Sequence, residues 1–238
     1  MAAKPHSWSH GERMAVLRRC PLFAPWPDAR LADLATIARA EYYPRGTEIY
    51  AQDPAKREAF VIASGEIEVS RGSAAGKKFV LGINGPAEIL AIVRLLEAPK
   101  IHYDYRAYED SVLLHLPIDA LAAILNGDPM LWRDVALLMC ARHGDSLRLL
   151  DAQNLGSLDQ RMAATLADLA RIHGIAGDHG IELGLRLPQE QLGAMLGVTR
   201  QSVNKLLRGF EGAGLIVVDY NRITIRDPAA LDAIAARP

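Results

Sequence analysis

The sequence predicts an α+β protein in which an N-terminal antiparallel β-roll of the jelly-roll kind precedes a long helix and a C-terminal winged helix-turn-helix. Three observations support this order. Apolar residues recur with a period of two from Ala40 to Leu116, as in half-buried strands. Helical spacing then runs from about Pro129 to Asn154. Finally, residues 188–210 hold two short amphipathic stretches joined at a glycine, the pattern of a helix-turn-helix. The expected domains are 1–127 (roll with flanking helices), 128–156 (long helix and hinge) and 157–238 (C-terminal domain).

The composition indicates a globular chain. Of its 238 residues 50% are hydrophobic and 23% are charged, and the formal net charge is −1. The longest apolar run, Val135–Ala141, is too short to cross a bilayer, and the N-terminus lacks a signal-peptide pattern. The two cysteines, Cys20 and Cys140, lie far apart, so they form neither a disulfide framework nor a CxxC metal site. We therefore expect a cytoplasmic protein without a membrane partner.

Many short strands make up the predicted roll. Residues 8–38 first show two helical patterns, separated by a proline-rich break at 25–27. Turn residues, such as those at 44–46 and 84–86, then divide the following segment into short apolar runs. Short strands at regular spacing are typical of a sandwich or small barrel. The expected strands are 48–50, 60–62, 66–70, 79–81 and 112–116.

After Pro117 the helical period returns. A short helix is expected over 118–125 and a long one over 129–154, with apolar positions at alternating steps of four and three. This spacing is the signature of a coiled coil and predicts that two copies of the chain pair in parallel. The middle of the seam is polar, and two interpretations stay open: a layer that fixes register, or a functional site. The expected interface residues are Leu131, Val135, Leu138, Arg142 and Leu149.

The C-terminal domain contains the most specific local pattern. A capping box at Ser157 and Gln160 opens a helix that ends near His173, and a glycine-rich loop follows over 174–184. In the helix-turn-helix, small Gly193 lets the two helices approach each other. Gly197 ends the first helix, because glycine takes a left-handed backbone at no steric cost.

The second helix of this pair presents a polar face without carboxylates. The segment 186–226 holds six basic and three acidic residues, so positive charge concentrates here in a chain whose total is −1. Two strands near 215–218 and 223–225, joined by a turn, predict a wing. We expect this domain to bind double-stranded DNA, with the second helix in the major groove. The predicted DNA-binding residues are Thr199, Arg200, Gln201, Ser202, Asn204, Lys205 and Arg208.

Motifs over nearly the whole chain resemble those of the Crp/Fnr superfamily of bacterial transcription regulators. In the roll these are the segments 43–46, 60–69 and 85–90, and in the C-terminal domain the segment 189–216. The resemblance implies a cyclic-nucleotide-binding-like effector domain and a homodimer that binds a palindromic DNA site. It also implies contact with RNA polymerase and no enzymatic activity.

The sequence departs from the cyclic-nucleotide members of this family at the effector site. Where they carry a Gly-Glu pair for the ribose, this chain has Ala91-Ile92, and their phosphate-binding Arg-Ser or Arg-Thr falls within 100–103, Lys-Ile-His-Tyr. Isoleucine cannot accept hydrogen bonds, and a buried phosphate needs a cation. We therefore expect an effector that is not bound in the usual cyclic AMP manner. The pocket candidates are Glu88, Leu90, Ala91, Ile92, Lys100, His102, Arg106 and Ser146.

The same residues bear on other effectors and on another class of protein. Two cysteines cannot ligate an iron–sulfur cluster. A haem with His102 as ligand, a cyclic dinucleotide and effector-independent activity stay open, and Cys140 is expected to be a packed, inert thiol. A cupin-type metal enzyme would need clustered ligands, and the roll offers only His102 and His115. We expect neither a metal nor catalytic residues.

Overall fold

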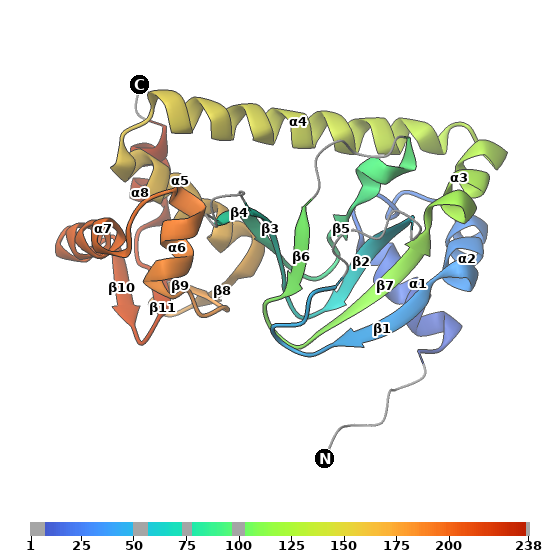
Figure 1. Cartoon of the computed structure of the whole chain (residues 1–238), viewed down its shortest axis with the longest axis horizontal. Coiled ribbons are helices and arrows are strands. Elements are labelled where there is room, and N and C mark those ends of the chain that lie inside the picture. The colour runs from blue at the N-terminus through green and yellow to red at the C-terminus, as the bar shows by residue number, and fades with distance from the viewer. Residues whose placement is uncertain (1–7, 50–56, 73–77, 97–102, 237–238) are drawn as a thin grey trace, which may run out of the picture. The chain divides into compact units, whose positions relative to one another are not determined.

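The structure is a computed structural model that describes residues 8–49, 57–72, 78–96 and 103–236. The chain forms two compact units (Figure 1): residues 1–71 with 83–142, and residues 72–82 with 143–238. The long helix α4 (Leu131–Leu155) contributes residues to both units. None of the described helices combines the length and the apolarity that crossing a bilayer requires.

The roll consists of two antiparallel sheets, ordered β1-β7-β2-β5 and β4-β3-β6. Three of its strands were not predicted. β1 and β6 are short and mix charged with apolar residues, and β5 has only two residues. Conversely, the strand expected at 48–50 is a single bridge from Glu48 to Arg106. The strands are β1 (Arg39–Tyr43), β2 (Glu58–Ser64), β3 (Ile67–Gly72), β4 (Lys78–Asn84), β5 (Ile89–Leu90), β6 (Asp104–Ala107) and β7 (Ser111–Pro117).

Three helices and a 3-10 turn accompany the roll: α1 (His10–Arg19), α2 (Asp28–Ile37), η1 (Ile92–Leu95) and α3 (Ile118–Gly127). Ser9 caps α1 in a capping box with Glu12, so two backbone N–H groups at its start are satisfied. The helices share one apolar core with β2 and β7, and Phe23, Trp26 and Leu116 lie fully buried within it. A second apolar cluster, with Phe60, Tyr105 and Leu113, fills the inside of the roll.

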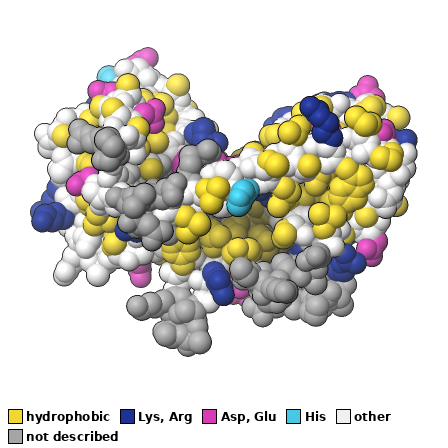
Figure 2. Space-filling model, turned by 90° about the horizontal axis from the view of Figure 1, so that it is seen from above, with side chains coloured by type: hydrophobic (Ala, Val, Ile, Leu, Met, Phe, Trp, Pro, Cys, Tyr) yellow, Lys and Arg dark blue, Asp and Glu magenta, His cyan; other side chains and the backbone are white. Residues whose placement is uncertain are grey.

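α4 has two apolar faces that are exposed to different degrees. Leu131 and Val135 belong to the core of the roll and are 5% and 4% exposed. Leu137 and Leu147, by contrast, are 53% and 48% exposed. Figure 2 looks onto the face of the molecule that carries α4, and hydrophobic side chains gather on it. The exposed side of α4 therefore carries apolar residues that the roll does not cover, beside polar ones such as Asp145 and Ser146.

The second unit is a winged helix-turn-helix with a four-stranded sheet, ordered β10-β11-β9-β8. The loop expected at 174–184 is instead a hairpin, β8–β9, whose β9 pairs with β11 of the wing. The strands were not predicted because glycine, which is frequent in this segment, is depleted in strands. The capping box of Ser157 and Gln160 is present at the start of α5. The elements are α5 (Leu158–His173), β8 (Gly174–Gly177), β9 (Gly180–Leu183), α6 (Gln189–Leu196), α7 (Arg200–Gly212), β10 (Ile216–Asp219), β11 (Arg222–Ile225) and α8 (Pro228–Ala235).

Candidate DNA-binding surface and effector domain

α7 divides into a buried apolar side and an exposed polar side. Val203, Leu207 and Phe210 are buried, so the helix can face the domain in only one orientation. Most of the predicted DNA-binding residues lie on the other side: Thr199, Arg200, Gln201, Lys205 and Arg208 are exposed, and Ser202 and Asn204 are half-buried. Within the described part of the chain, the three cations among them take part in no ion pair. Their charge is therefore available to an anionic partner.

The start of α7 is fixed by local contacts. Thr199 is its N-cap and accepts a hydrogen bond from the backbone N–H of Ser202, 3.2 Å away. Gly197 ends α6 with φ 68°, the left-handed conformation that favours glycine. A Cβ on Gly193 would lie 2.8 Å from the carbonyl oxygen of Val198. The two helices are thus closer than any side chain at 193 would allow, as the sequence predicted.

A further contact at this turn was not predicted. The guanidinium of Arg161 on α5 donates a hydrogen bond to the carbonyl oxygen of Leu196, the last residue of α6. The last carbonyls of a helix have no partner within the helix and carry partial negative charge, so a cation stabilises them. Nothing in the local sequence connects these two positions, which lie 35 residues apart.

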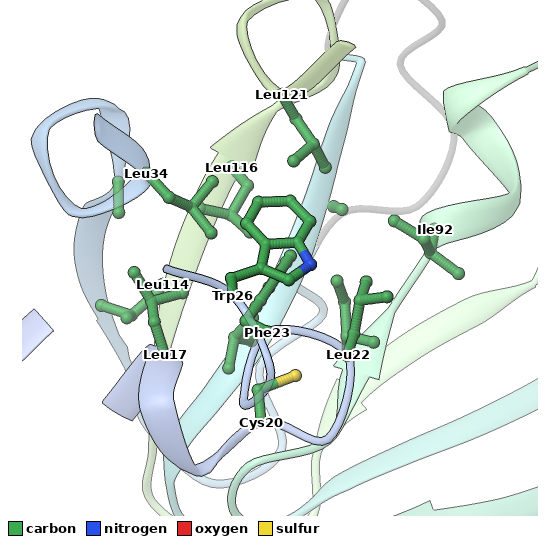
Figure 3. Packing of buried hydrophobic residues seen from close by; sticks show 14 of the residues in the cluster. Leu17, Cys20, Leu22, Phe23, Trp26, Leu34, Ile92, Leu114, Leu116 and Leu121 are labelled. Atoms are coloured by element: carbon green, nitrogen blue, oxygen red, sulfur yellow. The ribbon is translucent and has the colours of Figure 1, made fainter. Parts of the chain in front are cut away.

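In the effector domain, the two residues that replace the family's Gly-Glu pair point to different places. Ala91 follows β5 in a left-handed conformation, φ 58°, and packs in the cluster inside the roll together with Leu90. Ile92 instead belongs to the core shared with the helices, where it lies near Leu22 and Trp26 (Figure 3). Ile92 therefore serves packing and does not line the inside of the roll, which corrects its place among the pocket candidates.

Arg106 is a second correction. The residues of β6 alternate, so that Tyr105 and Ala107 are buried while Arg106 is exposed. Its guanidinium lies 3.2 Å from a carboxylate oxygen of Glu48. It faces outward and cannot supply positive charge inside the roll.

The other pocket candidates are distributed as follows. Glu88 is half-buried, and its carbonyl oxygen accepts a hydrogen bond from the backbone N–H of Ile62. Ser146 is exposed on the part of α4 that belongs to the second unit. Lys100 and His102 lie outside the described residues.

Both units match known families. Residues 40–128 match the cyclic nucleotide-binding domain, and residues 160–234 match the Crp-like helix-turn-helix domain. The chain belongs to the Crp/Fnr superfamily. It is a transcription regulator of this type, with an effector domain followed by a helix-turn-helix.

Similar proteins align with most of the length of this regulator. The cyclic AMP receptor protein of Thermus thermophilus is 24% identical over 193 residues, which are 81% of this chain and 86% of that protein. Among solved structures, FixK2 of Bradyrhizobium japonicum has a TM-score of 0.75 at 17% identity, covering 85% and 99% of the two chains. The c-di-GMP responsive regulator CLP of Xanthomonas campestris has a TM-score of 0.71 at 18% identity, covering 84% and 100%. These two likenesses show the same fold.

The dimer seam predicted on α4 of this regulator needs correction. Leu131 and Val135 are buried in the chain's own core, and Leu138 packs against it. Arg142 donates a hydrogen bond to the carbonyl oxygen of Ile89 in the roll. Leu131 and Val135 therefore cover the roll, while Leu138 and Arg142 contact it and are half-buried. The side chain of the fifth, Leu149, lies outside the described residues.

A buried histidine in the roll of the regulator, His115, has hydrogen-bond partners that the sequence did not predict. Nδ1 of His115 lies 2.8 Å from Oε2 of Glu58, and Nε2 lies 2.9 Å from the Tyr43 hydroxyl. The ring also packs edge-on against Phe60. Burial lowers the pKa of His115, and the bond to Glu58 only partly opposes this effect. A neutral ring fits both contacts, because Nδ1–H can donate to the carboxylate while Nε2 accepts from the hydroxyl.

Proposed function

We propose that this Crp/Fnr regulator binds palindromic double-stranded DNA as a homodimer, with α7 of each copy in the major groove. The observation that carries the proposal is the exposed face of α7, where Arg200, Lys205 and Arg208 make no ion pair with other described residues. Two such helices in a symmetric dimer would read half-sites about 34 Å apart, one turn of DNA. The protein would act in the cytoplasm and recruit RNA polymerase.

The side chains of α7 suggest separate tasks. Arg200 at the start of the helix has the planar fork that matches O6 and N7 of guanine. Gln201 can both donate and accept, which suits N6 and N7 of adenine. Lys205 is a point charge that reaches guanine or a phosphate without the fork, and Arg208, one turn beyond, is suited to a phosphate.

The dimer would form through the exposed side of α4. We define its apolar stripe as Leu137, Cys140, Ala141, Gly144 and Leu147, which lie at positions i, i+3, i+4, i+7 and i+10 and so share one side of the helix. Its leucines and Cys140 are exposed in the single chain, so pairing with a second copy would remove their apolar surface from water. Small residues at its centre would let the helices approach closely.

The effector would not be cyclic AMP in its usual pose. Ile92, at the position of the family's glutamate, offers no carboxylate for a ribose and packs in the helical core, and Arg106 faces away from the inside of the roll. One similar protein is named for cyclic AMP and another for c-di-GMP, so the fold accommodates different ligands. Calorimetry with cyclic AMP tests this part: micromolar binding would contradict it.

Selection of binding sites from random duplexes tests the DNA interface. Arg200→Ala should cost about 1–3 kcal/mol of binding free energy and relax the preference at one base pair of each half-site. Arg208→Ala is the matched control, because losing a phosphate contact should weaken all sequences alike. If Arg200→Ala leaves the selected motif unchanged, α7 does not read that base and the proposed interface is wrong.

A further inference from the structure

The tip of the wing presents an aromatic side chain on an unfavourable backbone. β10 and β11 are joined by a two-residue turn, Tyr220 and Asn221, between the paired residues Asp219 and Arg222. Both turn residues have positive φ, 42° for Tyr220 and 67° for Asn221. Such turns favour Asn-Gly or Asp-Gly, and a bulky residue at positive φ is strained. Tyrosine is therefore a poor choice for folding this turn.

Packing does not compensate for the strain, because Tyr220 is 91% exposed. A strained residue that contributes no burial indicates that its side chain is kept for contact with a partner. An exposed tyrosine combines a ring that can lie against another surface with a hydroxyl that can donate a hydrogen bond.

The tip is held firmly against the helix-turn-helix. The carbonyl oxygen of Asn221 accepts a hydrogen bond from the backbone N–H of Leu187, 2.7 Å away, and Leu187 directly precedes the N-cap of α6. A carboxylate oxygen of Glu211 on α7 accepts from the N–H of Val218. Arg222 pairs with Glu182 of β9 at 2.7 Å. The wing tip therefore has a fixed position beside the start of α6.

That position indicates the partner. When the second helix of a helix-turn-helix lies in the major groove, the first helix crosses the sugar-phosphate backbone. A group fixed beside the start of α6 then lies next to that backbone. Tyrosine hydroxyls are among the groups that donate to phosphate oxygens in protein–DNA complexes.

We propose that Tyr220 is a DNA contact: its hydroxyl donates a hydrogen bond to a backbone phosphate beside the half-site, and its ring lies against the adjoining sugar. This inference rests on the proposed DNA interface of α7. The contact is uncharged and independent of sequence, so it adds affinity without base preference.

Fluorescence anisotropy of the full-length protein on a specific and a random duplex tests the contact. Tyr220→Phe removes only the hydroxyl, and Tyr220→Asn removes the ring while suiting the left-handed backbone. Both should weaken binding to the two duplexes alike, by about tenfold. The salt dependence should not change, because no cation is lost. The melting temperature of Tyr220→Asn should equal or exceed that of the wild type. Tyr42→Phe, at an exposed tyrosine of the roll, is the matched control and should bind normally.

Several outcomes would overturn the inference. Wild-type affinity of both Tyr220 variants would exclude a contact with DNA. Unchanged DNA affinity with reduced transcription by RNA polymerase would assign the tip to a protein partner instead. A change in base preference would place Tyr220 on a base rather than on a phosphate. Failure of the α7 interface itself is distinguished by Arg200→Ala, which would then leave the selected motif unchanged.

Discussion

Replacing Gly193 by alanine tests whether the approach of α6 and α7 needs glycine. The new Cβ would lie 2.8 Å from the carbonyl oxygen of Val198 and 3.7 Å from the backbone nitrogen of Arg200. Carbon and oxygen atoms normally approach to about 3.3 Å, so backbone would have to move by roughly half an ångström. Overpacking of this kind costs about 1–3 kcal/mol, while alanine gains about 0.4–1 kcal/mol over glycine through the unfolded chain. We expect a net destabilisation of about 1–2 kcal/mol.

The same substitution at Gly209 is the matched control. Gly209 lies within α7, and nothing surrounds the position of its Cβ within 4 Å. Alanine should therefore stabilise the helix there, by about 0.5–1 kcal/mol. Urea unfolding of the two variants should give changes of opposite sign relative to wild type. If Gly193→Ala is as stable as Gly209→Ala, the close approach does not constrain this turn and the steric argument fails.

Three further predictions concern α4, the buried histidine and the thiols. Leu137→Glu would place a charge in the proposed dimer seam and should give monomers in analytical ultracentrifugation, with weaker DNA binding. Because burial lowers the pKa of His115 in the folded protein, the unfolded state binds a proton at a higher pH than the folded state does. Stability should fall as the pH drops below about 6.5, the ordinary histidine value, and melting curves of His115→Gln should show a flatter profile. In the Leu137→Glu monomer, exposed Cys140 should react rapidly with Ellman's reagent. Cys20 should react only on unfolding, since burial raises the pKa of its thiol to about 11.

Each of these has a control or an opposing result. A Leu137→Glu protein that stays dimeric and binds DNA as the wild type does would contradict the proposed seam. An unchanged pH profile in His115→Gln would assign the acid sensitivity to other groups. Equal rates for the two thiols in the folded monomer would contradict the burial of Cys20.

The helix-turn-helix could be predicted closely because its signals are local. Gly193, Gly197 and Thr199 each do what the sequence indicated: close approach, left-handed turn and N-cap. The strands of the hairpin 174–183 could not be predicted, because they are glycine-rich and depend on pairing with β11. Their stability comes from a neighbour that lies about forty residues further along the chain.

The environment of His115 also depends on distant partners. Its strand is mostly apolar, and nothing in the neighbouring residues predicts the partners of the histidine. Glu58 and Tyr43 are 57 and 72 residues away and reach the ring through strand pairing. Likewise, the outward direction of Arg106 follows from the register of β6 with β3, since a shift by one residue would turn it to the inside. A prediction from residue type alone therefore overestimated the positive charge available inside the roll.

The spacing of apolar residues along α4 predicts that the helix forms a dimer seam, but it does not predict which side of the helix forms it. Leu131, Val135 and Leu138 recur at steps of four and three, and so do Leu137 and Leu147 when the small residues between them are included. A helix that packs on a domain and also pairs with a second copy must be apolar on two sides, and the sequence prediction chose the more hydrophobic of them. Burial in the single chain separates the two: the first series packs against the roll, so we propose that the second one pairs. A charge at Leu131 should then unfold the roll, whereas a charge at Leu137 should leave it folded and dissociate the dimer.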